Sequence, residues 1–204
     1  MRRMARKSFR PEIIQQGREL FLEQGGENIS FSQIAQRVKI AQPSIYNHFA
    51  NKTDLLVAIF EDAVSRGRVH TWPDALVDES ADKKLHYYMT NTWNFFRNNR
   101  EAYKLTLARY YYATFNDEVR KINEKTVLVA RSMIKKIIDE GVEQGVWTTE
   151  SSEATASTIQ GILMAELIMG VHGTAVGDGD AQLRRLIHVI EKLLNAPLIP
   201  ADQP

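Results

Sequence analysis

The stretch Ile29–Asp54, ISFSQIAQRVKIAQPSIYNHFANKTD, contains the starts of three helices and two tight turns within 26 residues. Ser30 and Gln33 have the spacing of a capping box, in which each side chain bonds the other residue's backbone N–H. Ile29 and Ile34 flank this pair in the arrangement of a hydrophobic staple. The stretch therefore predicts a short helix that begins directly after Ser30.

The connection after this helix is too short for anything except a sharp reversal. It runs from Lys39 to Gln42, and Pro43 then falls in the first turn of the next helix, where a missing N–H does no harm. Asn51 and Asp54 predict the start of a third helix. Two short helices across a turn of about three or four residues are typical of a helix-turn-helix. We therefore predict a protein that binds double-stranded DNA.

The distribution of charge supports this prediction, although the net charge of the whole chain is only +1. Residues 1–52 contain nine Lys or Arg against four Glu, a net charge of +5, which leaves −4 for the other residues. Positive charge gathered at one end is expected of a domain that binds phosphates. The basic arm before Pro11 reads as a disordered tail in the free protein, and its Arg3 is a candidate contact to a phosphate or a narrow minor groove.

The remainder of the chain has helical apolar periodicity, with no strand alternation and no internal repeat. The predicted fold class is all-α with about nine helices, and it has two parts. Residues 1–52 form a three-helix helix-turn-helix domain with its basic arm, and residues 53–204 form a helical domain for effector binding and dimerisation. No apolar run approaches the ~20 residues that span a bilayer, and no signal peptide precedes the first helix, so a cytoplasmic protein without membrane contact is expected.

Chemistry beyond binding has little support in this chain. It contains no cysteine, its five histidines are scattered, and no glycine-rich loop is placed to hold phosphates. We expect no metal site, no cofactor and no enzymatic activity. A small helical enzyme is a weaker reading, and a helix-turn-helix interaction module or a chromosome-associated protein without a transcriptional role is a stronger alternative. Salt-dependent binding to duplex DNA separates a DNA-binding protein from an interaction module.

Residues 14–60 resemble the DNA-binding domain of the tetracycline-repressor (TetR) family. The resemblance rests on Arg18-Glu19-Leu20-Phe21, Gly25, Ile34-Ala35, Ile45-Tyr46, His48-Phe49 and Lys52-Thr53-Asp54-Leu55-Leu56. It implies a dimeric repressor that leaves its operator when a small molecule enters the C-terminal domain. Three residues depart from the family pattern: Lys39 replaces a turn glycine, Ala41 replaces a Ser or Thr cap, and Gly17 replaces an alanine.

The helix after the turn is expected to enter the major groove, as recognition helices do. Gln42 and Asn47 have amides that pair with adenine, and Asn47 is also a phosphate candidate. Pro43 and Ser44 are small enough for close approach to base edges. The candidates for phosphate contact are Tyr46, His48, Lys52, Thr53 and Lys39. Alternatives stay open for three of these, with Tyr46 as a core residue and Lys39 or Lys52 as a solvated charge, whereas Phe49 and Ile45 are expected in the core.

The effector candidates are large apolar side chains on the middle helices, many of which must also fill the core. They are Tyr88, Met89, Trp93, Phe96, Tyr110, Met133, Ile137 and Met164, and they favour a hydrophobic or aromatic compound. The helix that follows Ser151 is apolar nearly all round, so it is predicted to form a homodimer interface with the last helix. Glu166 in that helix either pairs with a cation across the interface or contacts a polar group of the ligand.

Overall fold

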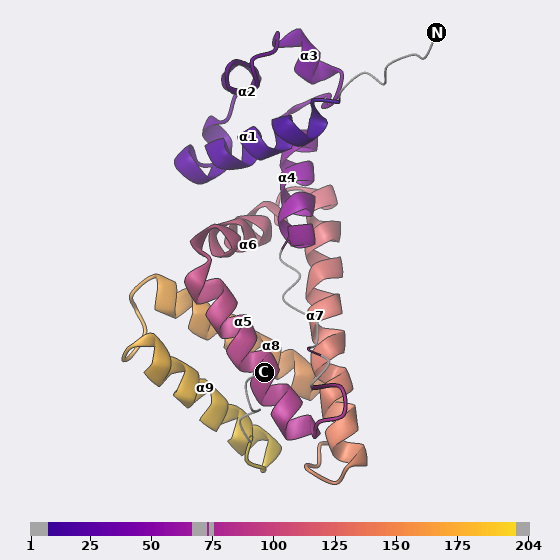
Figure 1. Ribbon diagram of the computed structural model, residues 1–204. Coiled ribbons are helices and arrows are strands. Elements are labelled where there is room, and N and C mark those ends of the chain that lie inside the picture. Colours follow the sequence, from indigo (N-terminus) through magenta and orange to yellow (C-terminus); the bar gives the residue numbers. More distant parts are fainter. Residues whose placement is uncertain (1–7, 67–72, 74–75, 199–204) are drawn as a thin grey trace. The chain divides into compact units, whose positions relative to one another are not determined.

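The computed structural model describes residues 8–66, 73 and 76–198 of the 204-residue chain. Over these ranges the chain is helical without strands, as Figure 1 shows, which confirms the predicted all-α class. None of the helices in the described ranges combines the length and apolar character needed to cross a membrane. The helices are α1 (Arg10–Gln24), the 3₁₀ turn η1 (Gly26–Asn28), α2 (Phe31–Val38), α3 (Pro43–Tyr46), α4 (Lys52–Arg66), α5 (Ala81–Asn98), α6 (Arg100–Tyr112), α7 (Asp117–Glu143), α8 (Ser152–Val171) and α9 (Gly179–Leu194).

The chain divides into two compact units, and neither is a continuous stretch of sequence. Among the described residues, the first unit comprises 8–66 together with 104–123, and the second comprises 73, 76–103 and 124–198. Helices α6 and α7 therefore each contribute residues to both units. In the structure α4 lies in the same compact unit as α1, α2 and α3. The boundary at residue 52, which separates a DNA-binding part from an effector-binding part, stays a prediction about function.

The first unit is held together by apolar faces of α1, α2 and α4, with α2 and α3 side by side at one end (Figure 1). Gly17 lets α1 approach α4 closely, because a Cβ at this position would lie 3.2 Å from Ile59 Cδ1. Residues much later in the sequence complete this core, namely Leu105 on α6, Ala113 and Val119. The helix-turn-helix therefore shares one hydrophobic core with part of α6 and the start of α7.

Local hydrogen bonds explain where α2 begins and ends. The Ser30 hydroxyl accepts a hydrogen bond from the Gln33 N–H at 3.2 Å, and the Gln33 side chain accepts from the Ser30 N–H at 3.0 Å, which confirms the predicted capping box. The helix ends at Val38, and the cap residue Lys39 after it has a left-handed φ of 59°, as expected at a position usually held by glycine. The N–H of Ile40 then donates to the Ala35 carbonyl, which satisfies a carbonyl in the last turn.

The next two helix starts differ from each other. Helix α3 begins at Pro43, and no side chain caps it, as expected where an alanine replaces a Ser or Thr cap. The residue in the cap position is Gln42, one residue after the expected Ala41. Helix α4 is capped as predicted by Asn51, whose side-chain oxygen accepts from the Asp54 N–H at 2.9 Å. Asp54 in turn accepts from the Ala50 N–H at 3.0 Å, so the two side chains hold the chain between α3 and α4.

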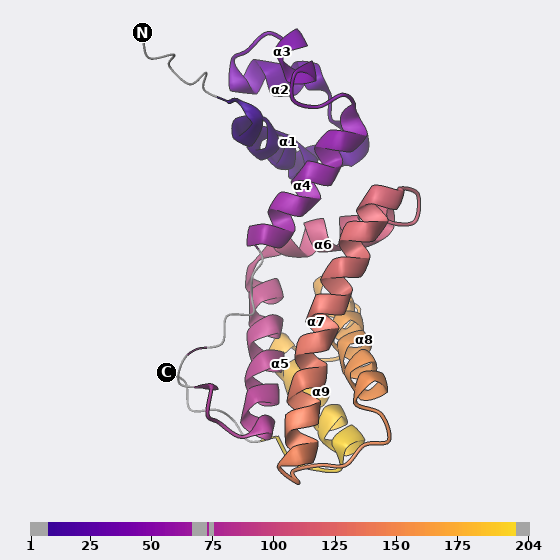
Figure 2. The same ribbon diagram turned by 90° about the vertical axis from the view of Figure 1, so that its right-hand side faces the viewer.

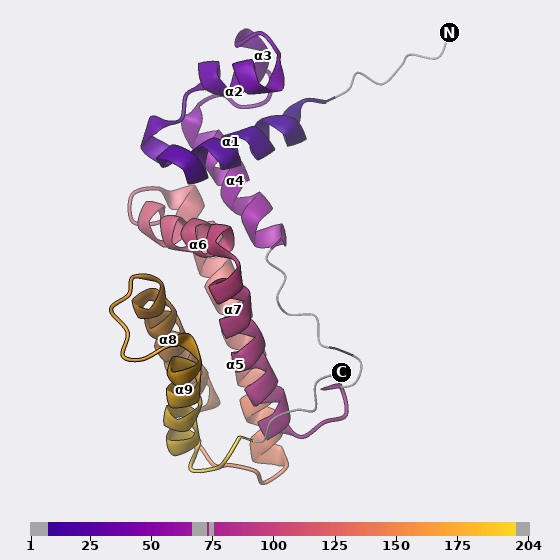
Figure 3. The same cartoon turned by 60° about the vertical axis from the view of Figure 1, so that its left-hand side comes forward.

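The second unit consists of α5, α8, α9 and most of α7. Its core is formed by large aliphatic side chains with almost no exposure, including Leu85, Ile134, Ile159, Leu163 and Leu186. Helices α8 and α9 pack on each other as a hairpin and both contact α5, as can be followed in Figures 2 and 3. Ser151 and Asp178 cap these two helices by accepting the N–H groups of Ala154 and Ala181.

Candidate nucleic-acid interface and effector region

Helix α3 presents a polar face outward and an apolar face inward. Gln42, Pro43 and Asn47 are exposed, and the Tyr46 side chain is 55% exposed. On the opposite face Ile45 is fully buried and Phe49 is 2% exposed, as predicted for core residues. Ser44 and His48 are half-buried at the edges. The amide, hydroxyl and imidazole groups on the outer face can therefore contact another molecule, while the buried Ile45 and Phe49 hold the helix on the core.

The flanking candidates lie on both sides of α3. Lys39 is exposed in the turn before it, and Thr53 is exposed in the first turn of α4. The Tyr46 ring packs edge-on against Phe31 with 5.1 Å between ring centroids, which orients its hydroxyl without burying it. The Lys52 ammonium donates to the main-chain carbonyl of Glu27, so this cation is held toward η1. Arg3 lies outside the described residues.

One cation of the basic segment is already neutralised within the first unit. Arg37 on α2 donates to both carboxylate oxygens of Glu23 on α1, one of them at 3.0 Å. These hydrogen bonds lower the pKa of Glu23 and raise the pKa of Arg37, so both groups stay charged near neutral pH. The pair ties α2 to α1, and it leaves Lys39 and Lys52 as the cations nearest to α3 along the chain.

Most of the predicted effector residues lie in the second unit. Tyr88, Met89, Trp93 and Ile137 are buried in its core, Phe96 and Met133 pack against that core, and Met164 is half-buried. Burial raises the pKa of Tyr88 far above its ordinary value, so its hydroxyl stays protonated. Tyr110 belongs to the first unit, whereas the other effector candidates belong to the second.

A cavity of 400 Å³ has Trp93 in its wall. Its other large side chains are Arg97, Arg100, Leu167 and Gln182, and the glycine-rich connection before α9 completes it. Arg97 forms an ion pair with Asp180 at 2.5 Å, which fixes its guanidinium beside the start of α9. Among the predicted effector residues, the structure therefore brings Trp93 next to charged groups that the sequence interpretation did not include.

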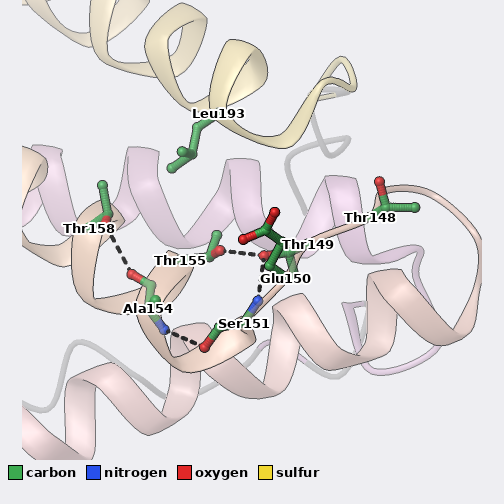
Figure 4. Close-up of a pocket in the computed structure, with 8 residues that line it drawn as sticks. All are labelled: Thr148, Thr149, Glu150, Ser151, Ala154, Thr155, Thr158 and Leu193. Carbon is green, nitrogen blue, oxygen red and sulfur yellow. Dashed lines mark hydrogen bonds between the residues drawn. The ribbon is translucent and has the colours of Figure 1, made fainter.

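A second hollow of 660 Å³ lies where α8 begins, and Figure 4 shows its lining residues. Most of its lining residues carry polar groups, and three of their hydroxyl groups are hydrogen-bonded: Thr149 with Thr155 at 2.7 Å, and Thr158 to the Ala154 carbonyl at 2.9 Å. Leu193 of α9 borders it from the other side. None of the predicted effector residues lines this hollow, whose lining comes from the connection before α8, the first turns of α8 and Leu193 of α9.

Glu166 finds its partners within its own chain. Its carboxylate accepts from the Gln182 amide at 3.3 Å and from the Arg185 guanidinium at 3.5 Å, both on α9. Arg185 also donates to the Val176 carbonyl at 2.6 Å. The sequence left a cation across an interface and a polar ligand group as alternatives for Glu166, whereas the cation that meets it here is Arg185 on the neighbouring helix of the same chain, where the pair joins α8 to α9.

One buried charged residue was missed from the sequence. Arg109 on α6 is only 5% exposed, and burial lowers its pKa. The sequence around it, REAYKLTLARYYY, gives an arginine the appearance of an ordinary solvated helix residue. No local pattern signals its burial, because the neighbours that cover it come from elsewhere in the chain.

Two short helices across a left-handed turn, with an exposed polar face on the second, define a helix-turn-helix domain, and a second helical unit accompanies it. The family of bacterial regulatory proteins called the tetR family matches residues 13–59, which confirms the resemblance found over residues 14–60. Residues 13–59 thus match the family's DNA-binding domain, and a solved structure described as a TetR-family regulator from Rhodococcus sp. shares the fold, with a TM-score of 0.68 at 16% identity over 91% of this chain and 97% of the other.

Similarity to individual proteins extends beyond the matched domain. The chain is 28% identical over 137 residues to the class G tetracycline repressor of Vibrio anguillarum, a match that covers 66% of this chain and only 59% of that repressor. A transcriptional regulator from Saccharomonospora viridis in complex with choline superposes with a TM-score of 0.74 at 19% identity, covering 89% of this chain and 95% of the other. FadR of Bacillus subtilis in complex with stearoyl-CoA gives a TM-score of 0.69 at 19% identity, covering 88% and 96%. These two structures establish the shared fold.

Proposed function

We propose that this protein is a dimeric transcriptional repressor that binds an operator through α3 and releases it when a small molecule binds the helical domain. The observation that carries the proposal is the exposed polar face of α3 above the buried Ile45 and Phe49. The identity to a tetracycline repressor supports a repressing role. Such a regulator would act in the cytoplasm, where bacterial DNA is found.

In this proposal Gln42 and Asn47 read bases, and Pro43 and Ser44 allow the backbone to approach them. Contacts to phosphates would fix the position of α3 in the groove. They would be made by Tyr46, His48, Lys39, Lys52, Thr53 and the arm residue Arg3. Lys52 would exchange its bond to the Glu27 carbonyl for a phosphate oxygen, which a charged donor favours.

The proposed dimer uses an exposed stripe of mostly small residues on α8. Its members are exposed and recur every three or four positions: Ala154, Thr158, Gly161, Ala165 and Met169. A Cβ on Gly161 would meet open space, so another helix has room to approach there. Val189 and Leu193 of α9 are also 45% and 44% exposed. Two copies of these faces would make a four-helix interface, and the hollow at the start of α8 would lie within it.

The proposed effector is a small molecule with a large apolar part. The buried Tyr88, Met89, Trp93 and Ile137, with Phe96, Met133 and Met164 around them, support an apolar binding site in the second unit. The complexes of structural relatives with choline and stearoyl-CoA are compatible with ligand control. Effector binding would shift the population toward an arrangement of the dimer that no longer fits the operator.

The DNA-binding part is tested by fluorescence anisotropy with the duplex upstream of the protein's own gene, titrated at several salt concentrations. Gln42→Ala and Asn47→Ala should each weaken specific binding by about 1–3 kcal/mol. Lys52→Ala should weaken specific and random duplexes alike and reduce the salt slope by about one unit. Lys136→Ala, an exposed lysine on α7, is the matched control. No preference of the unmodified protein for the upstream duplex over random DNA would reject the proposal.

The dimer is tested by measuring mass in solution with light scattering. Gly161→Arg places a long cation in the middle of the proposed interface and should give a folded monomer with unchanged helical circular dichroism. Lys136→Ala should remain dimeric. A monomeric unmodified protein, or a Gly161→Arg variant that is still dimeric, would reject this interface.

A further inference from the structure

Two tryptophans of the second unit are almost equally buried, but their indole N–H groups differ. Trp93 is 2% exposed and Trp147 is 3% exposed. The Trp147 N–H donates to the Ile138 carbonyl at 2.9 Å, whereas the Trp93 N–H is buried without a hydrogen-bond partner among the described residues. A buried tryptophan usually finds an acceptor for this group, because leaving it unpaired is unfavourable. Trp93 therefore has an unused donor inside the second unit.

Trp93 lies in the wall of the 400 Å³ cavity, where an acceptor from outside the chain has room to approach it. All the lining residues belong to the second unit, and they come from the end of α5, the first residue of α6, the end of α8 and the connection to α9. Leu167 adds an apolar side chain to the wall, and most of the lining residues from 170 to 179 are glycine or alanine. A cavity of this volume, with an apolar wall and a few polar groups, is typical of a site for a small molecule.

Arg97 brings a guanidinium to the same cavity. It follows Trp93 by four positions on α5, so the two side chains share one face of that helix. Its guanidinium lies against the first residue of α9, because a Cβ on Gly179 would be only 2.6 Å from Arg97 Cζ. The ion pair with Asp180 offsets the charge of Arg97 and holds it in this position.

Arg100 supplies the charge that remains in the lining. Asp178 is the one acid among the described lining residues, and its carboxylate accepts the Ala181 N–H at 2.8 Å as the cap of α9, where the helix N-terminus offsets its charge. Arg100 is exposed, and no carboxylate of the described residues pairs with it. The cavity therefore combines an unused N–H donor with an unpaired cation, and both favour a ligand that carries oxygen acceptors and a negative charge.

We propose that this cavity binds a small organic acid with an apolar body, and that such an acid is the effector. Its carboxylate is attracted to Arg100, its body packs against Trp93 and Leu167, and one of its oxygen atoms accepts the Trp93 N–H. This inference rests on the proposed function and narrows the effector from any apolar compound to an acid. The cavity joins α5 to the ends of α8 and α9, the helices of the proposed dimer interface, so a bound acid would favour one arrangement of the dimer over another.

The test uses the full-length protein, 4-phenylbutanoate as the probe and 4-phenylbutanamide as its neutral analogue. In calorimetric titrations at low salt the carboxylate should bind about three- to five-fold more tightly than the amide, because only the carboxylate is attracted to Arg100. The carboxylate should also weaken binding of the unmodified protein to the upstream duplex.

The indole N–H signals of ¹⁵N-labelled protein report on the tryptophans separately. The Trp93 signal is the one that is lost in Trp93→Phe, and it should move downfield when 4-phenylbutanoate is added. The Trp147 signal should stay in place, because that N–H is already bonded to the Ile138 carbonyl.

Three variants separate the two contacts. Trp93→Phe keeps an aromatic ring but removes the donor, so the affinity for 4-phenylbutanoate should fall about three- to ten-fold. Arg100→Gln, at an exposed position that is expected to leave folding intact, should lower the affinity for the carboxylate about three- to five-fold and leave that for the amide unchanged. Lys136→Gln removes an exposed cation of α7 away from the cavity lining and should match the unmodified protein with both probes.

Each other outcome has a defined meaning. Equal affinities for the carboxylate and the amide, no binding of the carboxylate, a Trp93 signal that does not move, or an unchanged affinity in Trp93→Phe or Arg100→Gln would overturn the acid site. Binding of 4-phenylbutanoate that leaves DNA affinity unchanged would overturn its role as effector. Failure of the unmodified protein to bind the duplex without the probe rejects the proposed function instead, and calorimetry and the indole signals then still report on the acid site.

Discussion

The phenol of Tyr112 on α6 donates a hydrogen bond to the carboxylate of Glu27 in η1, with 3.1 Å between the two oxygens. Its ring packs against Phe21 and Phe60, with centroids 6.1 and 5.9 Å away. The main-chain carbonyl of Glu27 also accepts the hydrogen bond from Lys52, one of the proposed phosphate contacts. Glu27 thus accepts hydrogen bonds from α6 and from the start of α4, and it links both helices to η1.

Replacing Tyr112 with phenylalanine removes only this hydroxyl group, and the free energy of unfolding should fall by about 1 kcal/mol. Burial, aided by Glu27, raises the pKa of Tyr112 to about 12 from its ordinary value of 10.0. The stabilisation is therefore complete below pH 10 and is lost as the pH rises from 10 toward 12. Urea denaturation at pH 8 and at pH 10.5 measures both effects. Tyr111→Phe, at a side chain that is 60% exposed, is the control, and an equal loss there would contradict the assignment.

Lys39→Gly should stabilise the protein by about 1 kcal/mol, because a left-handed backbone disfavours any residue with a Cβ. Lys39 has φ 59°, and the equivalent position at the end of α9 is held by Asn195 with φ 52°. Asparagine tolerates this conformation, so Asn195→Gly should change stability by only a few tenths of a kcal/mol. Chemical denaturation of both variants makes the comparison. Equal gains at the two positions would show that residue type does not determine the strain.

The helical glycines Gly141 and Gly161 should respond to alanine in opposite directions. A Cβ on Gly141 would overlap the indole of Trp147, which is 3% exposed and donates to the Ile138 carbonyl at 2.9 Å. Gly141→Ala should therefore destabilise the protein by about 1–3 kcal/mol. Within a single chain a Cβ on Gly161 meets no neighbour, so Gly161→Ala should gain up to about 1 kcal/mol of helix propensity in the monomer, and the approach of a second α8 in the proposed dimer would reduce this gain. Thermal denaturation at one protein concentration compares the two, and stabilisation by Gly141→Ala would contradict the packing described for Trp147.

His86 on α5 should make stability depend on pH in mildly acidic solution. Burial lowers its pKa below 6.5, and the nearby charge of Glu191 opposes this only in part. The folded protein therefore binds fewer protons at this site than the unfolded chain, so stability is complete above pH 6.5 and falls as the pH drops below it. His86→Gln should remove this contribution, measured as the difference in unfolding free energy between pH 7.5 and pH 5.5. The exposed His188, changed in the same way, is the control, and an unaltered pH difference in His86→Gln would contradict the prediction.

The helix-turn-helix was predictable because its determinants are local. The capping box of Ser30 and Gln33 and the Asn51 cap of α4 join residues three positions apart, so their spacing alone indicates where the helices begin. The strained Lys39 was predictable from the length of the turn and from the family pattern. The missing side-chain cap of α3 was predicted as well, although the cap position is Gln42 and not Ala41, a difference of one residue that is usual for helix ends.

The non-local features had no comparable signal. Leu105 and Val119 follow helical periodicity equally well whether they face the first or the second unit, so their place in the core of the helix-turn-helix was not foreseeable. The burial of Arg109 depends in the same way on which residues cover it. For Glu166, the oddity of an acid in an apolar helix was apparent, but only the packing of α9 shows that Arg185 is the cation that meets it.

The shared core around Leu105, Ala113 and Val119 sets a rule for protein engineering with this chain. A DNA-binding fragment truncated after α4 would expose the apolar surface that these three residues cover, and it would tend to misfold or aggregate. A chimera that transfers the DNA-binding unit of this chain to another regulator should include residues 104–123 as well as residues 8–66, because both segments belong to the same compact unit.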